Sequence, residues 1–195
     1  MKLLVPTKTP ALALVDINGQ PVQIGNGRRL LLSLFREANC PFCNFRVYDL
    51  TNNYPDLSNL GMDVVVVFKS DRDDILKFIA RRPRPFRMVS DPDGIAHEAF
   101  ALNSSMWGKL KAMLLRMPAL MRGMGMVGMS GMATGNLMPA DFLIDETGTV
   151  VETYYGQDAG DHIPMERIEL FAARGQASRS KGGQEKIGGH ATIRV

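Results

Sequence analysis

The chain has 195 residues, of which 45% are hydrophobic, and this is enough to build the core of one domain. Its net charge of +3 is small and arises mainly near the carboxyl end, so we do not expect a nucleic-acid-binding face. No apolar run approaches the roughly 20 residues of a membrane-spanning helix. The apolar start of the chain is too short for a signal peptide, so the cytoplasm is the expected compartment.

The hydrophobic pattern alternates between strand-like and helix-like segments. In chain order, the first half predicts strands over Ala11–Asp16, Pro21–Ile24 and Arg29–Phe35, a helix from Phe42 to about Leu57, a strand over Met62–Phe68 and a helix from Ser70 to Ala80. The second half predicts an extended segment over Phe86–Ser90, helices over Ile95–Ala101 and Met106–Arg122, strands over Ala140–Asp145 and Thr149–Tyr155, and a helix over Asp161–Ala173.

Turn and breaker residues set the expected boundaries. Asn18-Gly19 predicts a hairpin turn between the first two strands. Pro55 is expected to break the first helix, and Pro118 is expected to limit or kink the helix over Met106–Arg122. A strand–helix–strand unit followed by an antiparallel strand pair predicts an α/β domain with a mixed sheet and helices on both faces.

The only two cysteines of the chain form the motif Cys40-Pro41-Phe42-Cys43, directly after a buried strand and at the start of a helix. A helix start favours a thiolate, and Pro41 fits the first helical turn. The spacing lets one sulfur attack a mixed disulfide formed on the other. A zinc site needs about four ligands, and none of the three histidines has ligand spacing to the pair. We therefore expect a redox pair rather than a metal site or an inert pair.

Charged neighbours are candidates for tuning the two thiols. Arg36 and Arg46 could lower a thiol pKa by charge proximity, with solvated surface arginines as the alternative. Glu37 could relay a proton, with an exposed carboxylate as the alternative. We expect Cys40 to attack and Cys43 to resolve, because the first sulfur of such a motif is the more exposed one.

Four segments resemble one known family. They are the hairpin Pro10–Gly19, the turn Phe35–Cys43, the segment Pro85–Gly94 and the strand region Met138–Gly148. On these segments, which lie between about Val5 and Ala173, the chain is identified as a member of the alkyl hydroperoxide reductase/thiol-specific antioxidant (AhpC/TSA) group of peroxiredoxin-like proteins.

The resemblance implies a thioredoxin-like α/β fold, with a mixed central sheet flanked by helices and an amino-terminal β-hairpin. It implies one domain over residues 1–173 with a Met-rich helical insertion over about 104–135, followed by a basic tail over 174–195. Pro139 would be a cis-proline beside the two cysteines. Met138, Pro41 and Phe42 would complete the surface that receives the substrate.

The chain departs from the family pattern at several positions. Peroxiredoxins have a PxxxTxxC motif, whereas Ser33 and Arg36 stand seven residues before Cys40 and Cys43. No arginine lies near Pro139 to assist the reactive thiolate. These differences predict weak peroxidase activity.

The insertion holds most of the 13 methionines. We expect an apolar stripe that packs on the core, formed by Leu110, Met113, Leu114, Met117 and Met121. The Gly/Met segment Gly123–Gly135 is expected to lie near the cysteines and to shape or gate the substrate surface, because methionine surfaces adapt readily. A homodimer or protein interface and a Cu(I) site are the alternatives, since thioethers are soft ligands.

The sequence therefore favours a thiol–disulfide oxidoreductase. Cys40 would attack a disulfide, Cys43 would close the intrachain disulfide, and a cellular thiol would restore the pair. No cofactor or metal is expected. A peroxiredoxin-like thiol peroxidase with antioxidant function is the alternative in the same chemistry. A non-catalytic binding module that presents the Met-rich surface to a protein or to Cu(I) is the alternative from another class.

Overall fold

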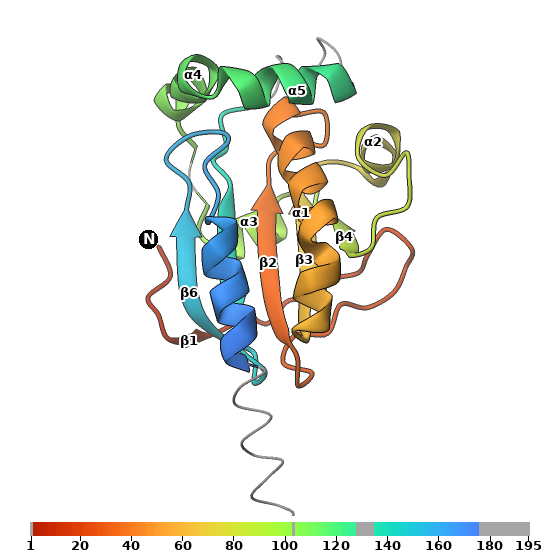
Figure 1. Ribbon diagram of the computed structural model, residues 1–195, viewed down its shortest axis with the longest axis vertical. Coiled ribbons are helices and arrows are strands. Elements are labelled where there is room, and N and C mark those ends of the chain that lie inside the picture. Colours follow the sequence, from red (N-terminus) through yellow and green to blue (C-terminus); the bar gives the residue numbers. More distant parts are fainter. Residues whose placement is uncertain (1, 103, 128–134, 176–195) are drawn as a thin grey trace, which may run out of the picture.

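The computed structural model describes residues 2–102, 104–127 and 135–175. Its framework is a six-stranded mixed sheet with the strand order β1-β6-β5-β2-β3-β4 (Figure 1). β3 pairs with β2 and β4 in parallel, while β2–β5, β5–β6 and β6–β1 are antiparallel pairs. The strands are β1 (Thr7–Lys8), β2 (Arg29–Phe35), β3 (Met62–Phe68), β4 (Arg87–Ser90), β5 (Ala140–Ile144) and β6 (Thr149–Tyr155).

Helices cover both faces of the sheet and one of its ends. α1 and the last helix, residues 165–175, lie against one face, α3 lies behind the sheet, and α4 and α5 lie across the end where α1 begins (Figure 1). The other helices are α1 (Pro41–Asn59), α2 (Arg72–Phe78), α3 (Ile95–Ala99), α4 (Met106–Leu115) and α5 (Met117–Val127). This is the thioredoxin-like α/β arrangement that the order of elements predicts. Within the described ranges, no helix combines the length and apolar character needed to cross a membrane.

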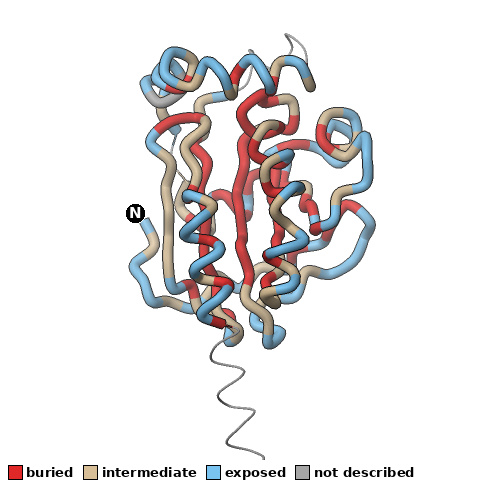
Figure 2. Tube along the Cα trace, in the orientation of Figure 1, coloured by how far each residue is buried: buried red, intermediate tan, exposed pale blue. Residues whose placement is uncertain are grey.

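The core lies on both faces of β2, which is buried from Leu30 to Phe35 (Figure 2). Leu31 and Phe35 pack on the α1 side of the sheet, whereas Leu32 packs with Phe100 on the other side. Burial on both faces explains why this strand is continuously apolar and shows no alternation. The predicted bounds of β2, β3 and β6 agree with the structure residue by residue.

The amino-terminal hairpin is less regular than expected. Ala11–Asp16 is not a strand: the two arms of the hairpin meet only in an isolated bridge between Val15 and Pro21. The turn itself forms, and the Asp16 carboxylate accepts the Asn18 N–H at 2.8 Å. The bridge is held by the Val22 N–H to the Leu14 carbonyl and the Asp16 N–H to the Gln20 carbonyl, both at 2.9 Å. The first arm then pairs with β4, where Asp16 bridges to Val89, so the hairpin ladder does not lengthen.

α1 continues through Pro55 and ends at Asn59, so the predicted break at this proline is wrong. The physical reason is packing on both sides of the proline. Leu57 is fully buried in the core, and Tyr54 packs edge-on against Phe86 with ring centroids 5.8 Å apart. Burial of one leucine contributes about 1.5–3 kcal/mol, which offsets much of the cost of about 3 kcal/mol for a proline inside a helix.

The Met-rich insertion forms two helices rather than one, and Pro118 lies in the first turn of α5, where its missing N–H is not needed. The predicted apolar stripe is wrong, because Leu114 and Met121 are exposed while Ala112 and Leu120 are buried. The break between the helices prevents a single stripe from facing the core. Residues 128–134 of the expected Gly/Met segment, and the expected tail from residue 176 onward, lie outside the described residues.

A buried polar cluster ties β2 and β5 to the segment before the last helix. The Ser33 hydroxyl donates to the Asp141 carboxylate, which also accepts the Ile163 N–H at 2.8 Å and contacts His162 Nδ1 at 3.1 Å. Burial raises the pKa of Asp141, but the charge and hydrogen bond of His162, the charge of Arg46 and the Ser33 hydroxyl outweigh it. The net effect holds the pKa of Asp141 below its ordinary value.

We predict that Asp141→Asn destabilises the fold at pH 7 by about 3 kcal/mol, because it removes one partner of a buried charged contact. A carboxylate whose pKa is lowered by folding adds stability above its unfolded pKa of about 3.9, and this contribution is lost as the pH falls toward the folded pKa. The difference in unfolding free energy between wild type and variant, measured with urea, should therefore become smaller below about pH 4.

Asp73→Asn is the matched control, because the Asp73 side chain is 95% exposed. It should change the unfolding free energy by less than about 0.5 kcal/mol. An equal effect of the two substitutions at pH 7 would contradict a stabilising role for the buried cluster.

Candidate active site

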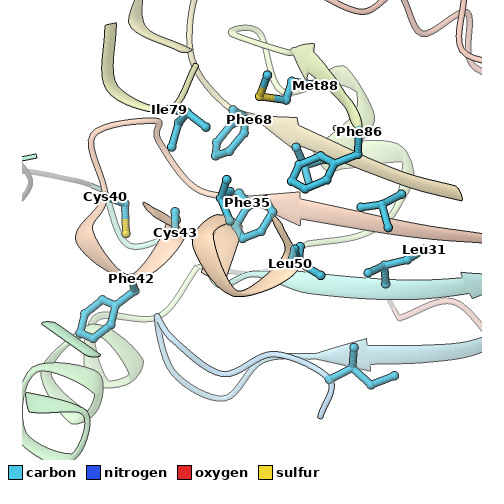
Figure 3. Close-up of a cluster of buried hydrophobic side chains, with 14 of the residues drawn as sticks. Leu31, Phe35, Cys40, Phe42, Cys43, Leu50, Phe68, Ile79, Phe86 and Met88 are labelled. Atoms are coloured by element: carbon cyan, nitrogen blue, oxygen red, sulfur yellow. The ribbon is translucent and has the colours of Figure 1, made fainter. Parts of the chain in front are cut away.

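The two cysteines lie side by side at the start of α1 (Figure 3). Cys40 is the N-cap residue, with extended backbone, and Cys43 lies in the first turn. Both are free thiols, and both are fully buried. The expectation that Cys40 exposes its sulfur is therefore wrong for this closed arrangement. Phe42, between them in sequence, points away from the pair (Figure 3).

The surroundings separate the acidities of the two thiols. Burial raises the pKa of Cys40, but the hydrogen bond from the Cys43 thiol, the positive charge of Arg36 and the N–H groups of Cys43 and Phe42 outweigh it. Together they lower the pKa of Cys40 from 9.0 to about 7. Burial and the neighbouring Cys40 raise the pKa of Cys43 well above its ordinary value. When the pair loses one proton, Cys40 therefore loses it and Cys43 keeps its own.

Arg36 is the charged partner of this thiolate. It directly follows β2, its side chain is buried, and its Nη1 lies 3.7 Å from Cys40 Sγ. Its Nη2 donates to the carbonyl oxygen of Gly135. The sequence left open whether Arg36 tunes a thiol or lies in solvent, and the structure brings it to Cys40.

The backbone that carries Arg36 is anchored by a buried histidine. His97 Nε2 lies 2.7 Å from the carbonyl oxygen of Phe35, and His97 Nδ1 lies 2.6 Å from the Asp91 carboxylate. Sequence reasoning considered His97 only as a metal ligand. The Phe35 carbonyl that His97 contacts lies 62 positions earlier in the chain, and no local sequence pattern indicates this contact.

Two further polar side chains hold the loop between β2 and α1. Asn44 Nδ2 donates to the carbonyl oxygens of Ala38 and Cys40, at 2.7 and 3.0 Å. The Ser70 hydroxyl accepts the Ala38 N–H at 2.9 Å. Sequence reasoning missed both residues, although an asparagine in the first turn of a helix is a known signal for bonds to nearby backbone.

Glu37 and Arg46 contact other groups than the thiols. Glu37 Oε1 accepts the Gly135 N–H at 2.9 Å, and Glu37 borders a polar pocket of about 300 Å³ that also contains Lys69. Arg46 donates to the Ile163 carbonyl at 2.7 Å. Its charge helps to lower the pKa of Asp141. Arg46 therefore supports the buried polar cluster of the fold.

The four residues expected to form the substrate surface are Pro41, Phe42, Met138 and Pro139, and all four are buried. The expected cis bond at Pro139 is also wrong, because Val5–Pro6 is the cis bond among the described residues. The Pro139 carbonyl accepts the Gly156 N–H at 2.9 Å, next to the paired residues Ala140 and Tyr155. This hydrogen bond extends the pairing of β5 with β6 to Pro139.

α5 covers the start of α1 and closes the site. Gly123 packs directly on Pro41, and a Cβ added to this glycine would overlap the Pro41 carbonyl oxygen. Leu120 of α5 and Ala112 of α4 belong to the same buried cluster as the two cysteines. Because both thiols are fully buried in this cluster, a substrate can reach them only after the residues around them move. By contrast, a pocket of about 500 Å³ lies near the opposite end of β2, where Arg28 and Asp63 line it.

Comparisons with known proteins agree with this fold. The family model described as AhpC/TSA matches residues 5–153. A Mycobacterium tuberculosis protein with a provisional peroxiredoxin name is 25% identical over 165 residues, which cover 84% of this chain and 92% of that protein.

Two solved structures share the fold. Xanthomonas campestris peroxiredoxin Q has a TM-score of 0.61 at 18% identity, over 89% of this chain and 96% of the other. A Chlorobium tepidum protein, provisionally described as the thiol:disulfide interchange protein DsbE, has a TM-score of 0.57 at 21% identity. The match covers 86% of this chain and 96% of the other. At these identities the likeness concerns the fold alone. The family match covers most of the chain, and the chain therefore belongs to the AhpC/TSA family, the peroxiredoxin-like group that its motifs predict.

Proposed function

We propose that this protein is a two-cysteine thiol peroxidase in which Cys40 attacks a hydroperoxide and Cys43 resolves the product. The observation that carries the proposal is the contact of 3.7 Å between Arg36 Nη1 and the Cys40 sulfur, whose pKa is lowered to about 7. About half of Cys40 is then thiolate at neutral pH, and a guanidinium lies beside the reacting atom. Family membership supports peroxide over disulfide as the substrate.

In the first step the Cys40 thiolate attacks the terminal oxygen of ROOH. The S–O bond forms while the O–O bond breaks, so Cys40 becomes a sulfenic acid and RO⁻ leaves and takes a proton to give ROH. Negative charge moves from sulfur to the leaving oxygen during this step. Arg36 is close enough to Cys40 to donate hydrogen bonds to that oxygen.

In the second step Cys43 attacks the Cys40 sulfenic acid. The S–S bond forms, the S–OH bond breaks, and the hydroxyl leaves as water with the proton of the Cys43 thiol. The high pKa of Cys43 keeps this thiol protonated until Cys40 has been oxidised. An external thiol reductant then supplies the two electrons that restore the dithiol.

Because of Arg36, we expect a higher peroxidase activity than the sequence motifs predict. The expectation of weak activity rested on the absence of a PxxxTxxC motif and of an arginine near Pro139. Arg36 reaches Cys40 from the end of β2, so the chain has a cationic donor at the thiolate from a different position. One such donor is commonly worth about 10²–10³ in rate.

Thiol–disulfide exchange, which the sequence alone favoured, becomes the second candidate. The hydrogen bond between the thiols of Cys40 and Cys43 favours it, because the two sulfurs are already within reach of each other. Turnover measured in parallel with hydrogen peroxide, an organic hydroperoxide and a protein disulfide separates the candidates. A peroxidase should consume both peroxides faster than it reduces the disulfide, and the reverse order would favour exchange.

Cys40→Ser should abolish peroxide consumption, because it removes the attacking sulfur. Cys43→Ser should still complete one turnover and accumulate a Cys40 sulfenic acid, because only the resolving thiol is missing. Stopped-flow measurement of the first turnover, with mass spectrometry of the trapped product, tests both expectations. If Cys43→Ser fails in the first turnover while Cys40→Ser reacts, the roles of the two cysteines are reversed.

Arg36→Met should raise the pKa of Cys40 by about one unit or more, since the thiolate loses its nearest positive charge. Thiolate absorbance against pH, in a Cys43→Ser background, reports Cys40 alone. The rate of peroxide consumption should fall by about 10²–10³. Arg122→Met is the control, because Arg122 is exposed and lies over the Phe45 ring. Equal titration curves for the two variants would argue against the role of Arg36.

Gly123→Ala should displace α5 and expose the two thiols, because the added methyl group would overlap the Pro41 carbonyl oxygen. We expect a thiol reagent to react at least about tenfold faster than with the wild type, while circular dichroism shows the fold retained. Gly125→Ala is the matched control in the same helix, since nothing lies within 4 Å of the added Cβ. A thiol reactivity unchanged by Gly123→Ala would show that α5 does not limit access.

A further inference from the structure

The outer side of the Met-rich helices is largely exposed (Figure 2), and many of its exposed side chains are apolar. Trp107 is 80% exposed, and Leu114 and Leu115 are 67% and 69% exposed. This lipophilic face, as we call it, consists of Met106, Trp107, Leu110, Leu114, Leu115, Met117 and Met121. Single exposed apolar side chains are ordinary, but four of these, Trp107, Leu110, Leu114 and Leu115, line one hollow, and such a cluster indicates an interaction site.

The charge of this region has one sign. No acidic residue occurs between Glu98 and Asp141, whereas four basic residues do: Lys109, Lys111, Arg116 and Arg122. Arg116 is neutralised by ion pairs with Asp158 and Asp161. Lys111 is exposed and lines the same hollow as Trp107 and Leu110, and none of the described residues that line this hollow is acidic, so this border of the lipophilic face is cationic.

A hollow of about 470 Å³ lies within the lipophilic face. Leu110, Leu114 and Leu115 form its apolar wall, with Trp107 and Lys111 at its border. Apolar side chains surrounded by lysine or arginine, with a tryptophan among them, are typical of helices that lie in the interface of a bilayer. Negatively charged headgroups would face the basic border while acyl chains contact the apolar wall.

A second copy of the chain fits this surface less well. Two copies joined by a two-fold axis would bring the same basic border together from both sides, and like charges that face each other oppose association. An anionic bilayer supplies the complementary charge and also matches the apolar wall.

We propose that the lipophilic face docks on an anionic lipid bilayer. α4 and α5 also cover the cysteines, because Gly123 packs on Pro41 and Leu120 lies in the cluster that contains Cys40. Docking would therefore bring the thiols to the membrane surface. In combination with the proposed peroxidase function, on which this part rests, the substrate class is the hydroperoxide of a membrane lipid.

Trp107 makes the docking directly measurable, because it is the only tryptophan of the chain. The full-length protein is mixed with vesicles of phosphatidylcholine alone or of phosphatidylcholine with phosphatidylglycerol. We expect a blue shift of the Trp107 emission and co-sedimentation with the anionic vesicles, and both should weaken as salt is added.

Leu114→Glu combined with Leu115→Glu should lower the vesicle partition coefficient by at least about tenfold, because it places two charges in the apolar wall. Leu170→Glu is the matched control, since Leu170 is 58% exposed on the last helix. The control should bind like the wild type. Consumption of hydrogen peroxide should be unchanged in both variants, whereas consumption of a phospholipid hydroperoxide in vesicles should fall only when docking is lost.

Three results would overturn the proposal: no binding to anionic vesicles, equal binding to neutral and anionic vesicles, or equal loss of binding in Leu170→Glu. A concentration-dependent dimer that is lost in Leu114→Glu, without vesicle binding, would assign the face to a second copy. Capture of a protein partner without vesicle binding would likewise contradict it. Vesicle binding without turnover of either peroxide would support docking and contradict the peroxidase function.

Discussion

A negatively charged sulfur inside a dry site is the constraint on which this structure depends. Burial alone would keep the Cys40 thiol protonated, because a charge loses its hydration there. The charge is retained because the Cys43 thiol, the Arg36 guanidinium and the N–H groups of the first helical turn all face it. β2 delivers Arg36 to this point, α1 delivers both cysteines, and the His97–Phe35 contact fixes the backbone directly before Arg36.

The same burial creates the problem of access. Within a closed, water-poor site the attraction between Arg36 and Cys40 is stronger than it would be in water, which favours a reactive thiolate. The cover that excludes water also excludes the substrate, however. α5 rests on the start of α1 through Gly123, where only a glycine allows this close approach. The packing of α5 on α1 therefore opposes access to the thiols in the arrangement that the structure shows.

The sequence predicted most of what depends on local pattern and less of what depends on contacts between distant residues. β2 and β3 were predictable because unbroken apolar runs have few alternatives. Pro55 was misleading because its cost is offset by the burial of Leu57, which only the folded core reveals. The motif correctly predicted that the two cysteines lie together at the start of a helix. Neither the choice of Arg36 over Arg46 nor the covering role of Gly123 could be read from spacing, because each depends on which segments meet in space.

The pH dependence of the reaction between reduced wild-type protein and hydrogen peroxide tests the central claim most directly. The second-order rate constant, followed by stopped flow, reports the thiolate fraction of the attacking cysteine. Because the pKa of Cys40 is lowered to about 7, the rate should rise through pH 7 and reach a plateau by about pH 8. A rate that keeps rising to about pH 9, as for an ordinary thiol, would contradict a thiolate stabilised by Arg36 and Cys43.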